Sequence, residues 1–228
     1  IFHIGEKIKQ IAENSSEFEK IMESIEKSDG VIWVFPVYHF LVPSQLKQFI
    51  EIAAESKRAS VFQGKYSTSI VTSIHFYDNL AENYIHSVSE ELGMRYLKGY
   101  LAEMTDLKKS EKQPEILSFA KEFFSAVKNK KIVQKKFAQL NREKIEYNPE
   151  TAEEDVKDSK YKIVMITDSS DKTGNLAKMR EQFIASCKNS IELINLDEVE
   201  TKGGCTGCCR CGYSNNCIYE DGMTEVIN

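Results

Sequence analysis

Residues 31–35 (VIWVF) constrain the fold of this chain more than any other feature. All five side chains are apolar, so a strand formed here presents hydrophobic groups to both faces of its sheet. Strands of that kind belong in the middle of a parallel sheet that is covered by helices on both sides. We therefore expect residues 31–35 to form an inner strand, with Trp33 packed in the core.

Short apolar runs and amphipathic stretches alternate along the rest of the chain. Strands are predicted at residues 1–4, 67–73, 95–101, 162–166 and 191–196, and helices at about 15–27, 44–55, 80–92, 114–127 and 175–187. This alternation predicts an α/β fold with a doubly wound parallel sheet.

The composition changes in the middle of the chain. Residues 131–160 are rich in charged side chains and poor in apolar ones, which is typical of a solvated linker. We expect a first domain at residues 1–130, a charged linker at 131–160, and the first half of a second unit at 161–228.

Length and charge exclude several classes of protein. A chain of 228 residues can bury a core without disulfides. Its 30 Lys and Arg against 35 Asp and Glu give a net charge of −5, which disfavours binding to duplex nucleic acid or an anionic membrane. The longest apolar stretch, residues 31–42, is too short to span a bilayer. We expect a cytoplasmic protein.

Five of the six cysteines lie within residues 205–217. In a cytosolic protein such crowding favours metal or redox chemistry over structural disulfides. The spacing of Cys205, Cys208, Cys211 and Cys217 places four thiolates in one compact loop, as a tetrahedral metal or an iron–sulfur cluster requires. Structural zinc and a set of reduced, unligated thiols are the alternatives.

A hydroxyl-rich turn at residues 167–175 separates a predicted strand from a predicted helix. Amides at a helix N-terminus and the hydroxyls of Ser169, Ser170 and Thr173 favour a phosphate. Asp168 and Asp171 count against it, because a carboxylate repels a phosphate. Hydroxyl and carboxylate side chains at this position also serve as plain helix caps.

Two segments resemble known families. Residues 28–51 (SDGVIWVFPVYHFLVPSQLKQFIE) resemble the flavin-binding signature of NADPH-dependent FMN reductases and iron–sulfur flavoproteins. Residues 162–223 resemble the beginning of the same fold: strand, phosphate loop, helix, strand and cysteine motif. The resemblance implies a flavodoxin-like sheet of strand order 2-1-3-4-5 and, on the four cysteines, an iron–sulfur cluster of the four-iron type.

The order of these segments is inverted relative to that fold, because the phosphate loop follows the flavin signature. We interpret the chain as a window on two tandem copies, the first without its own first strand and phosphate loop. The strand–helix–strand unit at residues 161–196 is a candidate to complete the first sheet.

The resemblance also implies a site for FMN. One wall of the flavin cleft is expected from Pro36, Val37, Tyr38, His39 and Phe40, and the other from Ser73, Ile74, His75 and Phe76. The phosphate is expected at Ser169, Ser170, Thr173, Gly174 and Asn175. No catalytic acid or base is assigned, because the flavin performs the redox chemistry.

The leading hypothesis is an FMN-dependent oxidoreductase or electron-transfer iron–sulfur flavoprotein that accepts hydride or electrons from NAD(P)H or a reduced carrier. Its partners are then small-molecule or protein electron donors and acceptors, without nucleic acid or membrane, and we expect a homo-oligomer. The alternative is a degenerate, non-catalytic flavodoxin-like module that binds zinc or a protein partner through the cysteine loop.

Overall fold

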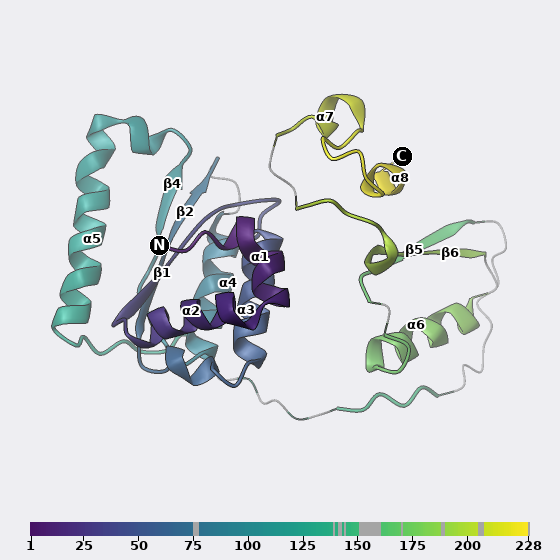
Figure 1. Cartoon of the computed structure of the whole chain (residues 1–228), viewed down its shortest axis with the longest axis horizontal. Coiled ribbons are helices and arrows are strands. Elements are labelled where there is room, and N and C mark those ends of the chain that lie inside the picture. The colour runs from purple at the N-terminus through teal and green to yellow at the C-terminus, as the bar shows by residue number, and fades with distance from the viewer. Residues whose placement is uncertain are drawn as a thin grey trace. The chain divides into compact units, whose positions relative to one another are not determined.

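The computed structural model describes the chain except for residues 75–77, 139, 141–142, 144, 151–160, 170, 188–189, 205–207 and 228. The chain divides into two compact units, which are described separately (Figure 1). Unit 1 comprises Ile1–Asn141 and unit 2 comprises Arg142–Asn228.

Unit 1 is built on a parallel sheet, as the strand–helix alternation predicts. Its strands are β1 (Gly30–Pro36), β2 (Tyr66–Ser73), β3 (Arg95–Tyr96) and β4 (Tyr100–Glu103). Strand β2 pairs with β1 on one side and with β3 and β4 on the other. The single strand predicted at residues 95–101 is therefore two short ones, both parallel to β2.

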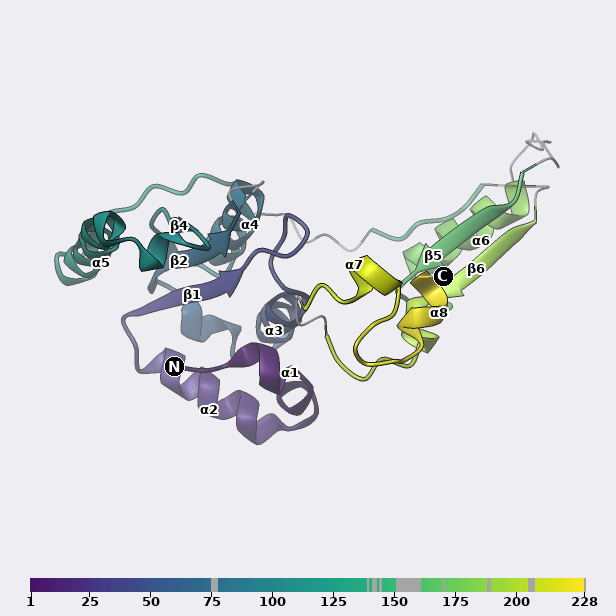
Figure 2. The ribbon, with the colours of Figure 1, turned by 90° about the horizontal axis from the view of Figure 1, so that it is seen from above.

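Helices cover both faces of this sheet. They are α1 (Ile4–Glu13), α2 (Ser15–Glu26), α3 (Ser44–Glu55), α4 (Asp78–Glu91) and α5 (Gln113–Lys128), with short 3₁₀ turns at Ala59–Phe62, Asp106–Lys108 and Ser110–Lys112. Figure 2 shows α1, α2 and α3 on one side of the sheet and α5 on the other. Among the described helices, none combines the length and apolar character that a membrane crossing requires.

The main core lies between the sheet and α1–α4. Trp33 and Phe35 of β1 are buried there with Phe49 of α3 and Ile85 of α4. The indole N–H of Trp33 donates to the Ser67 hydroxyl at 3.0 Å, so its polar atom is satisfied within the core. The core position predicted for Trp33 is confirmed.

The prediction of an inner strand at residues 31–35 is wrong for the described residues. Within them β2 is the sole strand partner of β1, so β1 is an edge strand. Ile32 is 40% exposed and Val34 is 68% exposed, whereas Gly30 at the beginning of β1 lies close to Phe123 of α5. The sequence pattern shows that both faces are apolar but not which neighbours cover them.

The predicted strand at residues 1–4 is also wrong, because helix α1 begins at Ile4. Ile4, Ile8 and Ile11 are spaced to lie on one helix face, and Ile8 and Ile11 are buried against the core. A run of four residues such as IFHI does not by itself distinguish strand from helix, and here the helical spacing beyond it prevails.

The beginning of the predicted linker is bound to unit 1 at a buried carboxylate. Glu90 in α4 is 3% exposed and accepts hydrogen bonds from the backbone N–H groups of Lys136 (2.9 Å) and Phe137 (2.8 Å). Its carboxylate also contacts His86 Nε2 at 2.8 Å, and the His86 ring stacks on Tyr96. These contacts fix residues 135–137 on the surface of α4.

Unit 2 contains β5 (Ile163–Thr167), α6 (Asn175–Ser186) and β6 (Ile191–Asn195), followed by a 3₁₀ turn at Leu196–Glu198 and by the short helices α7 (Cys211–Ser214) and α8 (Met223–Ile227). Strands β5 and β6 are parallel and form a sheet of their own. The β5–α6–β6 order agrees with the strand–helix–strand prediction. Its role in completing a flavodoxin-like sheet stays a prediction.

Candidate functional site

The strands of unit 1 end in register, which brings three chain segments to one edge of the sheet. Pro36 of β1 pairs with Thr72 of β2, and Thr72 pairs with Ala102 of β4. Because the strands are parallel, the residues that follow β1, β2 and β4 all emerge at their carboxyl ends. Ligands of open α/β sheets bind at such edges.

A tight turn follows β1 at this edge. The backbone groups of Tyr38 and Leu41 exchange two hydrogen bonds of 3.0 Å, so His39 and Phe40 form a two-residue hairpin turn. His39 has φ 43° and Phe40 has φ 71°, the left-handed region that non-glycine residues seldom occupy. Two such residues in succession hold the turn in a costly backbone conformation, a feature that clusters at functional sites.

Large apolar side chains are exposed around this turn. Phe40 and Leu41 follow β1, Ile74 follows β2 and Met104 follows β4, with exposed fractions of 41%, 52%, 72% and 66%. We call these four residues the apolar edge. A group of apolar side chains left in water at strand ends is suited to a flat, largely apolar ligand surface.

Polar contacts behind the apolar edge anchor its segments. The buried Ser73 hydroxyl donates to the Asp78 carboxylate at 3.0 Å, which joins the end of β2 to the start of α4. After β4, the buried Asp106 carboxylate accepts from the Glu103 N–H and from Lys109 Nζ, both at 3.0 Å. These two hydrogen bonds, that from Lys109 first, hold the pKa of Asp106 below its ordinary value.

The predicted flavin walls lie at this edge as far as they are described. Pro36, His39, Phe40 and Ile74 are exposed, Val37 and Tyr38 are half-buried, and Ser73 is buried. The two walls are adjacent, since the Val37 N–H donates to the Thr72 carbonyl at 2.9 Å. His75 and Phe76 lie outside the described residues. Sequence reasoning missed Leu41 and Met104, although each follows a strand end.

A comparison with known families concerns this same part of the chain. The family model for NADPH-dependent FMN reductase matches residues 2–106, a range that includes the whole apolar edge. The predicted family is confirmed for residues 2–106. Phosphate-loop and cysteine residues predicted in unit 2 lie beyond the match.

Solved structures overlap the chain only partly. An NADPH-quinone reductase from P. pentosaceus is 17% identical, with a TM-score of 0.40, and the match covers 46% of this chain and 73% of that one. A thermophilic tryptophan halogenase from Streptomycin violaceusniger (17%, TM-score 0.39) gives coverages of 51% and 77%. The flavoenzyme NAD(P)H:(acceptor) oxidoreductase from Paracoccus denitrificans (18%, TM-score 0.38) gives 53% and 70%. No sequence match was found among curated proteins.

The predicted phosphate loop in unit 2 is filled by its own carboxylate. Asp171 accepts hydrogen bonds from the Thr173 N–H (2.8 Å), the Thr173 hydroxyl (3.0 Å) and the Gly174 N–H (3.0 Å). The Ser169 hydroxyl accepts from the Asp171 N–H at 3.2 Å. Ser170 lies outside the described residues.

Asn175, the last residue predicted for the phosphate loop, binds the linker. Its side-chain N–H donates to the Ile145 carbonyl, and its side-chain oxygen accepts from the Tyr147 N–H at 2.8 Å. Gln182, two turns further along α6, donates to the Glu150 carbonyl. The side chain of Asn175 therefore holds residues 145–147 beside α6.

The described part of the cysteine loop does not assemble a metal centre. Cys208 and Cys211 are exposed and Cys217 is half-buried, while Cys205 lies outside the described residues. Among the described side chains, no group of three or more His, Cys, Asp or Glu is placed to hold a metal ion. The four-cysteine ligand set stays a prediction, since one of its members is not described.

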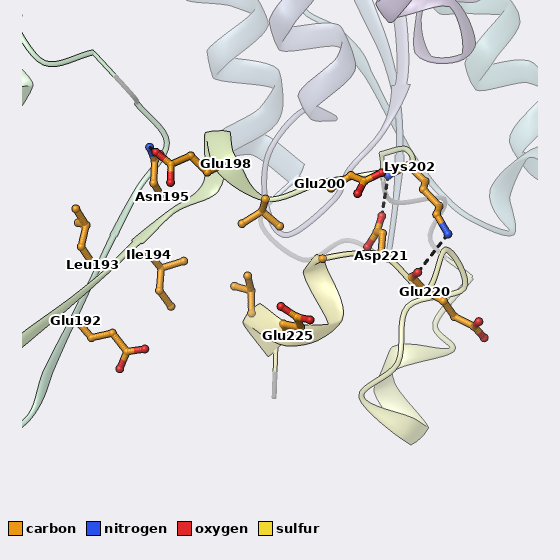
Figure 3. A pocket seen from close by; sticks show the side chains of 13 residues that line it. Glu192, Leu193, Ile194, Asn195, Glu198, Glu200, Lys202, Glu220, Asp221 and Glu225 are labelled. Carbon is orange, nitrogen blue, oxygen red and sulfur yellow. Dashed lines mark hydrogen bonds between the residues drawn. The ribbon is translucent and has the colours of Figure 1, made fainter.

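A pocket of about 780 Å³ in unit 2 is lined by none of the predicted site residues. It lies between β6, residues 198–202 and the segment leading into α8 (Figure 3). Six of its lining residues are acidic: Glu192, Glu198, Glu200, Glu220, Asp221 and Glu225. The sole cation in the lining, Lys202, donates from its backbone to Asp221 and from Nζ to the Glu220 carbonyl. Such a lining disfavours a phosphate-bearing ligand.

Proposed function

We propose that unit 1 binds FMN and belongs to an FMN-dependent oxidoreductase that accepts hydride or electrons from NAD(P)H or a reduced carrier. The observation that carries the proposal is the apolar edge, which lies at the carboxyl ends of three parallel strands within the family match. When bound, FMN supplies the redox chemistry, and the protein supplies binding and orientation.

The residues of the edge fit the flavin ring better than its phosphate. The backbone N–H groups of Val37, Tyr38 and Leu41 already donate to protein carbonyls, so those three amides cannot also bind the ring. The turn instead offers the apolar surfaces of Tyr38, Phe40 and Leu41. Burial of the accessible parts of these side chains against an aromatic ring system would supply the binding energy, at roughly 25 cal/mol per Å² of apolar area.

The experiment compares two substitutions of tyrosine by aspartate. Tyr38→Asp places a charge in the proposed flavin cleft, and we expect it to weaken FMN binding at least tenfold, measured by quenching of flavin fluorescence. Tyr161→Asp makes the same change at an exposed position in unit 2 and should leave FMN binding unchanged. Unaltered circular dichroism in both variants separates loss of the site from loss of the fold. Normal FMN binding by Tyr38→Asp would refute the site.

We further propose that the cysteine loop holds an iron–sulfur cluster that accepts single electrons. The spacing of Cys205, Cys208, Cys211 and Cys217 supports this, because thiolates select soft metals and clusters of iron and sulfide. Anaerobic reconstitution followed by iron and sulfide analysis tests it. Stoichiometric zinc without sulfide would refute the cluster.

A specific observation favours a second candidate function for unit 2. The phosphate loop is occupied by Asp171, as expected for a degenerate module that does not bind a flavin but binds zinc or a protein partner through the cysteine loop. The absorption spectrum of the purified protein discriminates between the candidates. A yellow or brown protein that releases flavin on heating supports the flavoprotein, and a colourless protein that contains zinc supports the module.

A further inference from the structure

The loop between β5 and α6 was expected to offer its hydrogen-bond donors to a phosphate. Three of those donors, the two backbone N–H groups of Thr173 and Gly174 and the hydroxyl of Thr173, converge instead on one carboxylate. Both oxygens of Asp171 take part, Oδ1 toward Thr173 and Oδ2 toward Gly174. The side chain thus occupies the place that an oxyanion would take at these amides.

The carboxylate is closely fitted into the loop. A Cβ atom added to Gly174 would lie 2.3 Å from Asp171 Oδ2, so any larger residue at position 174 would displace the carboxylate. The hydrogen bonds from Thr173, together with that from Gly174 and the nearby charge of Arg180, hold the pKa of Asp171 below its ordinary value. The group is therefore ionised at neutral pH.

We propose that Asp171 is a specificity-determining residue that excludes phosphate from the β5–α6 loop. A phosphate that approached the Thr173 and Gly174 amides would compete with a tethered carboxylate for the same donors and would be repelled by its charge. The residues present therefore do not fit the phosphate of FMN, although the position in the fold suits one. This inference does not rest on flavin binding by unit 1.

The contact of Asn175 with the linker is consistent with this inference. Its side chain is engaged by the backbone of Ile145 and Tyr147, so it is not directed to a ligand in the loop. Lys178, one turn further along α6, pairs with Glu146 at 3.1 Å. The start of α6 is thus bound to protein groups on its linker side as well as in the loop.

The test removes the carboxylate and uses inorganic phosphate as the probe. In Asp171→Ser, the Thr173 and Gly174 amides lose their anionic acceptor, and we expect phosphate to bind at least tenfold more tightly than to the unchanged protein. Binding is followed by the NMR shifts of these two amides during a phosphate titration. Asp168→Ser is the matched control, because Asp168 is an exposed carboxylate in the same loop.

A second variant protects the test against loss of the hydrogen bonds within the loop. Asp171→Asn keeps an oxygen that accepts from the loop amides but removes the charge. We expect it to gain phosphate affinity as well, though less than Asp171→Ser.

Three results would overturn the inference. The first is saturable phosphate binding by the unchanged protein at the Thr173 and Gly174 amides, as tight as in Asp171→Ser. The second is a gain in Asp168→Ser equal to that in Asp171→Ser, because the effect would then be one of overall charge. The third is the absence of any gain in a folded Asp171→Ser or, if that variant does not fold, in Asp171→Asn.

Discussion

Replacement of Glu90 by alanine removes the acceptor that holds residues 135–137 on α4. The carboxylate is 3% exposed, and it accepts from the N–H groups of Lys136 and Phe137 at 2.9 Å and 2.8 Å. Hydrogen bonds to a charged group contribute about 1.5–3 kcal/mol each. Because Lys136 is exposed, its segment can detach and bind water instead, which limits the loss. We expect Glu90→Ala to lower the free energy of unfolding by ~2 kcal/mol.

Urea unfolding and amide hydrogen exchange measure this effect at two levels. Unfolding gives the global change, and exchange at the Lys136 and Phe137 amides reports local detachment. A loss of ~2 kcal/mol corresponds to exchange about 30-fold faster at these two amides. Glu122→Ala in α5 is the matched control: it removes an exposed helical carboxylate and should change stability by less than about 0.5 kcal/mol. Unaltered exchange at both amides in Glu90→Ala would refute the inference that Glu90 holds residues 135–137 on α4.

The same carboxylate predicts a dependence on pH. Burial alone would raise the pKa of Glu90, but the hydrogen bonds from Lys136, Phe137 and His86 together hold it below its ordinary value of 4.5. A carboxyl group whose pKa is lowered by folding stabilises the fold at pH values above its pKa in the unfolded chain. This contribution is lost as the pH falls through its pKa in the folded protein. Below pH 4.5 we expect Glu90→Gln to lose less stability with falling pH than the unchanged protein.

Two further predictions concern the packing of unit 1 and the cysteine loop. In Gly99→Ala the new Cβ would lie 2.2 Å from the Ser69 hydroxyl oxygen and 2.9 Å from the Ser69 carbonyl oxygen, so we expect a loss of about 1–3 kcal/mol in thermal unfolding. Gly5→Ala, in helix α1 with open space around it, should instead stabilise by about 0.5–1 kcal/mol. Cys208→Ser should take up less iron and sulfide than the unchanged protein on anaerobic reconstitution, and equal uptake would point to Cys209 as the ligand.

Local patterns predicted most of the helices and strands of unit 1. Residues 15–27 and 44–55 have apolar side chains at helical spacing, and α2 and α3 lie there within about one residue. The division of residues 95–101 into β3 and β4 was not predictable. Between the two strands, Gly99 approaches Ser69 of β2 closely, and these residues are distant in the sequence.

Burial by distant neighbours was the least predictable property. The amphipathic pattern of the helix predicts an exposed side chain for Glu90. In the structure a backbone segment 46 residues later covers it. The residue types after β1 do not predict the hairpin turn. Hairpin turns with two positive φ angles favour Asn and Gly, whereas this turn has His39 and Phe40. The edge at which the candidate site lies was predictable, since parallel strands end at one edge whatever the turn.

The two units differ in what their strand ends offer a ligand. In unit 1 the ends of β1, β2 and β4 expose Phe40, Leu41, Ile74 and Met104, so a ligand that covers them gains the free energy of apolar burial. In the loop after β5 of unit 2, Asp171 already accepts from the Thr173 and Gly174 N–H groups, so an anion must displace a carboxylate before it gains these hydrogen bonds. The proposed binding of the flavin through apolar burial predicts that riboflavin and FMN bind the described edge with similar affinity. An FMN affinity more than tenfold higher would show that phosphate donors other than the Thr173 and Gly174 amides take part.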